Sequence, residues 1–231
     1  MNVLVVIPCY NEEGSIQSTI ERLKDKTPHL DFVVINDGSI DGTGEICTKN
    51  RYPVISLPFN LGLASAVQTG MRYAYLNKYE AAVQFDGDGQ HLSEYLPEMA
   101  KIMQEHSADI VVGSRYTQKN TRSLRGFGGG LIRFAIRITT GKTLSDPTSG
   151  LRMFNRKMIE DFATKMNYGP EPDTLAYLIN RGATVIEVPV TMQERKSGTS
   201  YLNTLNAMKY MLRMFVSILI IQRFRAMEGK I

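Results

Sequence analysis

The sequence predicts an α/β fold in which a mostly parallel central sheet is covered by helices on both faces. Short runs rich in β-branched residues alternate with segments whose apolar residues recur at helical spacing. Such alternation is typical of βαβ units. The composition is also that of a globular protein, since 43% of the 231 residues are hydrophobic and 22% are charged. A chain of this length can bury a large core without disulfides.

The first half of the chain supplies the clearest alternation. Residues 3–7 are apolar, mostly β-branched and followed by Pro8, as in a buried first strand. The helix expected at 12–24 places Ile16, Ile20 and Leu23 on one face. Further strands are expected at 32–35, 54–57, 81–85 and 110–112, and further helices at 42–50, 63–76 and 92–105.

The second half is less regular. A basic, apolar segment at 126–142 is followed by a polar loop at 145–150 and a strand at 185–190. Beyond residue 200, apolar residues recur at helical spacing beside lysines and arginines, which predicts an amphipathic helix suited to a lipid surface. A helix packed in the core or an oligomer interface would show the same pattern. We therefore expect a main domain over 1–200 and a C-terminal amphipathic helix over 201–231.

Charge, hydropathy and cysteines exclude several classes of protein. The net charge of +4 is too small to indicate nucleic-acid binding. The N-terminus lacks the basic segment of a signal peptide, and the longest apolar stretch near the C-terminus, 214–221, is shorter than the roughly 20 residues of a membrane span. Cys9 and Cys47 have no CxxC spacing, so a reducing cytoplasm is expected.

Three common binding motifs begin but are not completed. The sequence GKT at 141–143 ends like a P-loop, but Ile136 stands where that motif needs glycine. The glycines at 126 and 128–130 do not form GxGxxG. The sequence DGDG at 86–89 starts like an EF-hand loop, but His91 and Pro97 replace the required glycine and glutamate.

Polar residues follow the expected strands where ligands bind in parallel sheets, beyond the carboxyl ends. Asp86 and Asp88 come directly after a buried strand, and Gly87 between them permits a tight turn. Two close carboxylates repel one another, so a cation is their natural companion. Oxygen ligands favour Mg²⁺ or Mn²⁺, which would in turn hold a diphosphate. A solvated turn is the structural alternative.

Seven short motifs, taken in order, carry a family resemblance: PCYNE (8–12), NDGSIDGT (36–43), DGDGQH (86–91), GSR (113–115), DPTSG (146–150), EVPV (187–190) and RKSGTS (195–200). Over residues 3–200 the chain resembles family 2 glycosyltransferases of the GT-A fold. The last three motifs resemble the branch that contains dolichyl-phosphate mannose synthases and bacterial undecaprenyl-phosphate sugar transferases. The resemblance implies that 1–200 is a GT-A catalytic domain.

The resemblance implies a donor pocket at the strand ends. Its donor-binding residues are Pro8, Tyr10, Glu12, Ile35, Asp37, Asp86, Gly87, Asp88 and Arg195. Among these, Asp86 and Asp88 would also bind a divalent metal, Mg²⁺ or Mn²⁺, with Gln90 as a further ligand. Arg195 would clamp the donor diphosphate. The family motif often reads Asp-Ala-Asp, whereas this chain has Gly87 in the middle.

The acceptor side is expected to be cationic. The resemblance places Arg115 and Arg125 at an acceptor phosphate. A lipid phosphate has a second pKa of about 6, so it is largely ionised at neutral pH and needs no general base. A hydroxyl acceptor would need one. Asp146 and Glu171 are the candidates for a base or for holding sugar hydroxyls, and the alternative for Asp146 is a turn residue before Pro147.

These features predict an inverting, metal-dependent hexosyltransferase. Its donor would be a nucleotide diphosphate sugar, with UDP-glucose or UDP-N-acetylglucosamine favoured, and its acceptor a polyprenyl (undecaprenyl) phosphate. It would lie on the cytoplasmic face of the membrane, with a small membrane protein or a second copy as a further partner. Two alternatives remain: a family 2 enzyme that glycosylates a polysaccharide hydroxyl, and a catalytically silent protein that binds nucleotide sugars.

Overall fold

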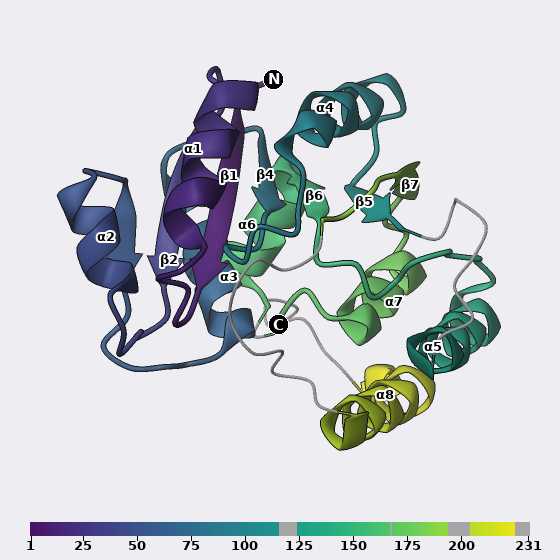
Figure 1. Cartoon of the computed structure of the whole chain (residues 1–231). Helices are drawn as coiled ribbons and strands as arrows, with labels where there is room; N and C mark the ends of the chain where they lie inside the picture. Colours follow the sequence, from purple (N-terminus) through teal and green to yellow (C-terminus); the bar gives the residue numbers. More distant parts are fainter. Residues whose placement is uncertain (116–123, 167, 194–203, 225–231) are drawn as a thin grey trace.

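A computed structural model describes residues 1–115, 124–166, 168–193 and 204–224 (Figure 1). Seven strands form one sheet in the order β3-β2-β1-β4-β6-β5-β7. The strands are β1 (Val3–Cys9), β2 (Asp31–Asn36), β3 (Val54–Ser56), β4 (Ala81–Gln84), β5 (Ile110–Ser114), β6 (Arg152–Asn155) and β7 (Val185–Pro189). Strand β6 runs antiparallel to both of its neighbours, and the other pairs are parallel. The predicted mostly parallel sheet is confirmed.

Helices cover both faces of the sheet, as predicted (Figure 1). They are α1 (Ile16–Lys26), α2 (Thr43–Lys49), α3 (Leu63–Leu76), α4 (Leu96–Glu105), α5 (Leu124–Thr140), α6 (Arg156–Thr164), α7 (Pro172–Asn180) and α8 (Thr204–Leu219). Two 3₁₀ turns accompany them, Ser93–Tyr95 and Ile221–Phe224.

The strands divide their side chains between two apolar cores. In β1, Leu4 and Val6 join the core beneath α3, α5, α6, α7 and α8, whereas Val5 and Ile7 join the core beneath α1, α2 and α4. This alternation follows from the two-residue period of a strand. Because β1 is buried on both faces, it reads as a continuous apolar run rather than an alternating one.

Three elements of the second half were not foreseen: β6, α6 and α7. Strand β6 has only four residues and begins with Arg152, so it gives no apolar run. Helix α6 follows it without a loop, because Asn155 ends the strand and also caps the helix by accepting a hydrogen bond from the Met158 amide. The first helix was expected to begin at residue 12 but begins at Ile16.

The C-terminal helix α8 packs beside α5 and α7 (Figure 1). Met214 and Ile218 are its buried apolar residues in the shared core. None of the helices within the described ranges is long and apolar enough to span a membrane. The expected division between 1–200 and 201–231 falls in a segment outside the described residues and stays a prediction.

Candidate active site at the carboxyl edge of the sheet

The loops that follow β1 and β2 are fastened to each other by side-chain to backbone hydrogen bonds. The Asn11 amide donates to Ser39 Oγ at 3.0 Å, and the Ile40 amide donates back to Asn11 Oδ1 at 3.0 Å. The Glu12 amide donates to Thr43 Oγ1 at 2.8 Å. Asn11 also takes a left-handed conformation, with φ of 55°. These contacts explain why α1 begins later than expected, since residues 11–13 are held in the paired loops.

The paired loops carry three of the residues predicted to bind the donor, Pro8, Tyr10 and Glu12. Tyr10 is 40% exposed, so its ring is available to a ligand. Glu12 is partly exposed, and its Oε2 accepts a hydrogen bond from Ser15 Oγ at 2.7 Å. Pro8 is buried, with its carbonyl 3.4 Å from the Gly87 amide that donates to it. The ends of β1 and β4 are thereby joined.

Asp37 holds the segment that leads into α3. Its two carboxylate oxygens accept hydrogen bonds from the amides of Leu61 and Gly62, each at 2.8 Å. Gly38 follows in a left-handed conformation, and a Cβ there would lie 2.3 Å from the backbone of Phe59. Asp37 thus shapes the rim of the site. Ile35, predicted to bind the donor, has a fully buried side chain in the core, and its carbonyl accepts from the Cys9 thiol at 3.6 Å.

Asp86 is oriented by two neighbours. Gln84 Nε2 donates to Asp86 Oδ1 at 3.1 Å. The Asp86 amide donates to His91 Nδ1 at 3.0 Å, and His91 Nε2 lies 3.7 Å from Asp86 Oδ2. Because Nδ1 accepts, the imidazole proton is on Nε2 and faces the carboxylate. His91 is nearly fully buried and therefore acts as a support for Asp86.

Asp88 lies two residues after Asp86 in the same loop. Its Oδ1 accepts a hydrogen bond from the Gln90 amide at 3.0 Å, and its side chain is mostly buried. Gly87 brings the loop against β1, since a Cβ there would lie 3.1 Å from Cys9 Cβ. Its carbonyl accepts from Ser15 Oγ at 3.0 Å. The predicted pair of carboxylates is therefore a built loop rather than a solvated turn.

The donor set of this loop fits a divalent cation that is shared with a phosphate ligand. Asp86 and Asp88 offer carboxylate oxygens, and Gln90 offers an amide oxygen. The described residues contain no group of three or more His, Cys, Asp or Glu side chains arranged to hold a metal. Mg²⁺ is commonly held by one or two carboxylates together with substrate phosphates and water. These residues thus suit a metal that completes its coordination with the donor diphosphate.

Asp146 and Arg115 form the best-organised ion pair of the site. Arg115 Nε and Nη2 donate to the two oxygens of Asp146 at 2.6 and 2.8 Å. The carboxylate is fully buried, whereas the arginine side chain is 37% exposed. Burial alone would raise the pKa of Asp146, but the hydrogen bonds and charge of Arg115 outweigh it and lower that pKa. Asp146 therefore orients Arg115, which disfavours a role as general base.

Glu187 in β7 anchors the loop that carries Asp146. Its carboxylate accepts hydrogen bonds from the amides of Ser145 and Asp146, at 2.6 and 2.7 Å. Gly150 at the other end of the loop approaches the carboxylate pair, since a Cβ there would lie 2.8 Å from Asp86 Oδ2. The loop at 145–150 thus brings the Arg115–Asp146 ion pair close to the Asp86 loop at the carboxyl edge of the sheet.

Sequence reasoning missed Arg152, which is buried beneath this loop. Its guanidinium donates to the carbonyls of Ser149 and Pro147, at 2.8 and 2.7 Å, and also to the carbonyl of Pro170. Desolvation lowers the pKa of Arg152, and the negative charge of Glu171 opposes that shift. Glu171 is partly exposed at the start of α7 and accepts a hydrogen bond from Tyr210 of α8. The available signal was an arginine directly before the apolar pair Met153 and Phe154.

Two predicted site residues are not placed with the others. Arg195 lies outside the described residues. Arg125 lies in the first turn of α5, but its side chain is outside the described part of the chain. Their predicted contacts with the diphosphate and the acceptor phosphate stay predictions.

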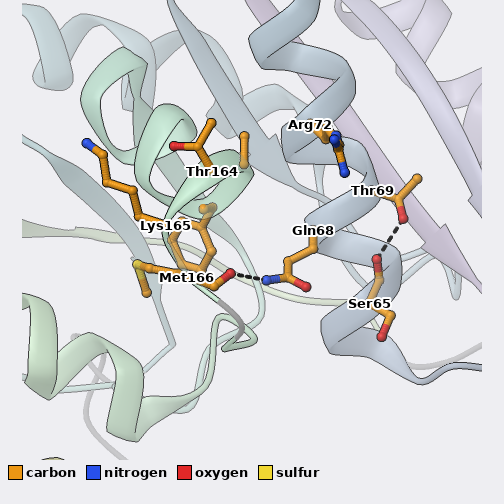
Figure 2. A pocket seen from close by; sticks show the side chains of 9 residues that line it. Ser65, Gln68, Thr69, Arg72, Thr164, Lys165 and Met166 are labelled. Atoms are coloured by element: carbon orange, nitrogen blue, oxygen red, sulfur yellow. Dashed lines mark hydrogen bonds between the residues drawn. The ribbon is translucent and has the colours of Figure 1, made fainter. Parts of the chain in front are cut away.

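A separate pocket of about 260 Å³ lies between α3 and α6 (Figure 2). Figure 2 shows Gln68 reaching across it to donate to the Met166 carbonyl, with Arg72 on the same helix. None of the predicted donor or acceptor residues lines this pocket. This pocket is therefore separate from the candidate active site at the carboxyl edge of the sheet.

The sheet order and the helices on both of its faces define the class of the protein, which has the GT-A fold of glycosyltransferases. The chain belongs to glycosyl transferase family 2, because residues 4–162 match the sequence model of that family. This membership confirms the predicted family, the GT-A fold and the assignment as a glycosyltransferase.

Known relatives cover nearly the whole chain. It is similar to an undecaprenyl-phosphate mannosyltransferase of Micrococcus luteus, with 31% identity over 87% of each chain. It is also similar to a polyprenol monophosphomannose synthase of Mycolicibacterium smegmatis, with 29% identity over 91% of this chain and 84% of the relative. Glucosyl-3-phosphoglycerate synthase of Mycobacterium tuberculosis, solved with Mn²⁺ and UDP, shares the fold with a TM-score of 0.71 and 18% identity, over 99% of this chain and 82% of that one.

Proposed function

We propose that the protein transfers a hexose from a nucleotide diphosphate sugar to a polyprenyl phosphate, with inversion at the anomeric carbon. The observation that carries this proposal is the pairing of Arg115 with the buried Asp146 beside the Asp86 loop. It provides a fixed cation next to a donor site. The names of the two mannose-transferring relatives, which act on polyprenyl phosphates, point to the same acceptor class.

The chemistry of the acceptor agrees with what the site contains. A phosphate oxygen that is already ionised attacks the anomeric carbon, and the bond to the diphosphate breaks with its electron pair on the leaving oxygen. No proton has to be removed from the nucleophile. Asp146 is held by Arg115 as an ion-pair partner, and this reaction does not need it as a general base. A hydroxyl acceptor is the less favoured alternative for the same reason.

The donor side would be bound by the loops after β1, β2 and β4. Tyr10 offers an exposed ring to the base, and Asp37 holds the rim at 61–62. Asp86 and Asp88 would hold Mg²⁺ or Mn²⁺ with Gln90. A divalent metal bound there supplies positive charge that offsets the negative charge developing on the leaving diphosphate. Arg195 is proposed to contribute to the same charge balance.

The donor sugar is a separate question. The preference for UDP-glucose or UDP-N-acetylglucosamine rests on no particular residue of the sequence. The names of two relatives specify mannose, whereas a relative from Methanococcus voltae is named for UDP-N-acetylglucosamine transfer to dolichyl phosphate. We therefore place a mannose donor first and N-acetylglucosamine second.

A membrane surface is the proposed location, because the acceptor is a lipid. Helices α5 and α8 lie side by side and expose the large apolar residues Leu131, Phe134, Ile138, Leu212 and Val216, and Ile220 directly after α8 is exposed as well. The exposed cations Arg137, Lys209 and Arg213 accompany them. Apolar residues with basic neighbours suit an anionic lipid surface. Peripheral binding at the cytoplasmic face, with or without a small membrane partner or a second copy, follows as a proposal.

A donor and acceptor screen tests the proposed reaction. Purified protein with Mn²⁺ is incubated with GDP-mannose, UDP-glucose or UDP-N-acetylglucosamine and with undecaprenyl phosphate in detergent. We expect a sugar-phosphate lipid from one donor, and none with undecaprenol, which lacks the phosphate. Equal transfer to undecaprenol would promote the hydroxyl acceptor, and donor binding without any turnover would favour a silent binding protein.

The metal is tested on the same assay. EDTA should abolish transfer, and Asp88→Asn should lower kcat by at least about 100-fold, the scale of losing a key electrostatic stabiliser. Mn²⁺ binding, followed by electron paramagnetic resonance with UDP present, should weaken in the variant. Asp25→Asn, which changes an exposed carboxylate paired with Lys26, is the matched control. Normal turnover of the Asp88 variant in EDTA would overturn the metal role.

A further inference from the structure

We propose that Tyr210 is a positioning residue that orients Glu171, so that helix α8 forms part of the wall of the active site. The inference deepens the proposed function and rests on it for the reaction that is measured. It gives the C-terminal helix α8 a role in the active site in addition to its proposed contact with a lipid surface. The inner face of α8 and the 3₁₀ turn that follows it make polar contacts with the start of α7.

Those polar contacts converge on the first turn of α7. The Tyr210 hydroxyl donates to Glu171 Oε2. Ser217 Oγ of α8 donates to Asp173 Oδ2 at 2.6 Å, and Gln222 Nε2 in the following 3₁₀ turn donates to the Asp173 carbonyl. Asp173, Ser217 and Gln222 are each less than 10% exposed. Because unsatisfied buried polar groups are costly, these partners fix α8 in one register against α7.

Tyr210 is suited to remain a hydrogen-bond donor. Burial raises the pKa of its phenol, and the nearby charge of Glu171 raises it further. The hydroxyl therefore keeps its proton across the working pH range. Glu171 is partly exposed, so Tyr210 holds one carboxylate oxygen while the side chain stays accessible to solvent.

Arg152 connects this contact to the rest of the site. Its guanidinium binds the carbonyl of Pro170, directly before Glu171, and the carbonyls of Pro147 and Ser149 in the loop that carries Asp146. The charge of Glu171 acts on the same guanidinium. Glu171 thus stands between a buried cation and the Tyr210 hydroxyl. A shift of α8 would release one side of this arrangement.

The outer face of the same helix carries the cations of the proposed lipid surface. Lys209 and Arg213 flank Tyr210 in sequence and are exposed, whereas Tyr210 is mostly buried. One helix therefore joins the surface that would meet lipid to the Glu171 carboxylate. This placement explains how docking of the helix and alignment of Glu171 can depend on one another.

The experiment is a double-mutant cycle on transfer to undecaprenyl phosphate. Tyr210→Phe keeps the ring and removes the hydroxyl, and we expect kcat/KM to fall about 10-fold, the lower range for a hydrogen bond to a charged group. The KM for the nucleotide sugar should stay within twofold. The kcat/KM of Glu171→Gln should fall further. The kcat/KM of the double variant should match that of Glu171→Gln alone, because Tyr210 acts through Glu171.

Tyr79→Phe is the matched control. Its hydroxyl donates to Asp31 Oδ2 at 3.0 Å, at the opposite end of the sheet from the site. We expect this variant to keep wild-type kcat/KM within twofold. Glu171→Asp, which draws the carboxylate back from Tyr210, should repeat the roughly 10-fold loss and serves if the phenylalanine variant does not fold.

The outcomes separate the inference from the proposed function. Additive effects in the cycle, or wild-type kcat/KM for Tyr210→Phe and Glu171→Asp, would overturn the positioning role while transfer by the wild type stands. No transfer by the wild type would overturn the proposed function. In that case the cycle is measured on the free energy of unfolding in urea, where a lack of coupling between residues 171 and 210 overturns the inference.

Discussion

The Asp146 carboxylate holds the Arg115 guanidinium at two points, with distances of 2.6 and 2.8 Å, while the Arg115 amide also donates to Asp146 Oδ2 at 3.1 Å. Thr148 Oγ1 adds a contact to the same carboxylate at 3.0 Å. Two-point pairing fixes the plane of a guanidinium as well as its position. Arg115 therefore has its orientation set before any ligand binds.

The first prediction concerns this pair. Asp146→Asn keeps the shape of the side chain but removes its charge and one acceptor of the two-point contact. We expect kcat/KM for the polyprenyl phosphate to fall about 10- to 150-fold, the value of a hydrogen bond to a charged group. Donor affinity, measured by calorimetry with UDP and Mn²⁺, should change less than twofold.

Asp109→Asn is the matched control, because Asp109 also accepts a backbone amide, from Thr184 at 2.9 Å, but lies at the amino end of β5. It should retain wild-type kcat/KM. If Asp146→Asn instead abolished donor binding and left acceptor KM unchanged, Arg115 would belong to the donor side of the site.

The second prediction concerns pH and stability. Burial would raise the pKa of Asp146, but the contacts from Arg115 lower it below its ordinary value. A group with a depressed folded pKa contributes stability above its unfolded pKa of about 3.9, and that contribution is lost as the pH falls through the folded pKa. The difference in Tm between wild type and Asp146→Asn should be constant above about pH 5 and shrink below pH 4.

Differential scanning fluorimetry from pH 3 to 8 measures this difference, and subtraction of the variant removes the contribution of the other carboxylates. A Tm difference that grows as the pH falls would mean that Asp146 is protonated in the folded protein, and the ion pair would be wrong.

Local patterns predicted the first half of the fold because each strand there is a buried apolar run. The carboxylate loop was predictable for a related reason, since Asp86 and Asp88 follow such a run directly. Strand β6 was not predictable, because it is short, begins with the charged Arg152, and the partners of that side chain are backbone carbonyls of the neighbouring loops. The hydropathy of a sequence does not show which backbone carbonyls will accept hydrogen bonds from a buried arginine. The role of Asp146 was likewise open, since its type fits a base, a turn or an ion pair until Arg115 is seen beside it.

The third prediction uses the close approach of Gly150 to Asp86. In Gly150→Ala the new Cβ would lie 2.8 Å from Asp86 Oδ2, and 3.5 Å from Gln84 Nε2 and His91 Cε1. The end of a carboxylate can swing aside, so the fold should persist with Tm within a few degrees. Asp86 would then point elsewhere, and misplacement on the scale of 1 Å costs about 100-fold in rate. We expect kcat to fall about 10- to 100-fold.

Mn²⁺ affinity separates this displacement from a general loss of structure. It should weaken in Gly150→Ala while UDP binding without metal is retained. Wild-type kcat and Mn²⁺ affinity in the alanine variant would show that the position of Asp86 near Gly150 has no bearing on the reaction.

The fourth prediction concerns the surface formed by α5 and α8. Lys209 and Arg213 are exposed on α8 beside Leu212 and Val216, which are 64% and 40% exposed. Each basic residue near an anionic membrane contributes about 1 kcal/mol. The double variant Lys209→Gln with Arg213→Gln should therefore bind vesicles containing anionic lipid about 10- to 30-fold more weakly in a sedimentation assay. The loss should diminish as salt is raised, because exposed charges are screened.

The double variant Lys49→Gln with Lys101→Gln is the control. It removes two exposed cations from α2 and α4, on the other face of the sheet, and should bind vesicles like the wild type. If both double variants weakened vesicle binding equally, the attraction would come from overall charge. If neither weakened it, the surface of α5 and α8 would instead be assigned to binding a protein partner.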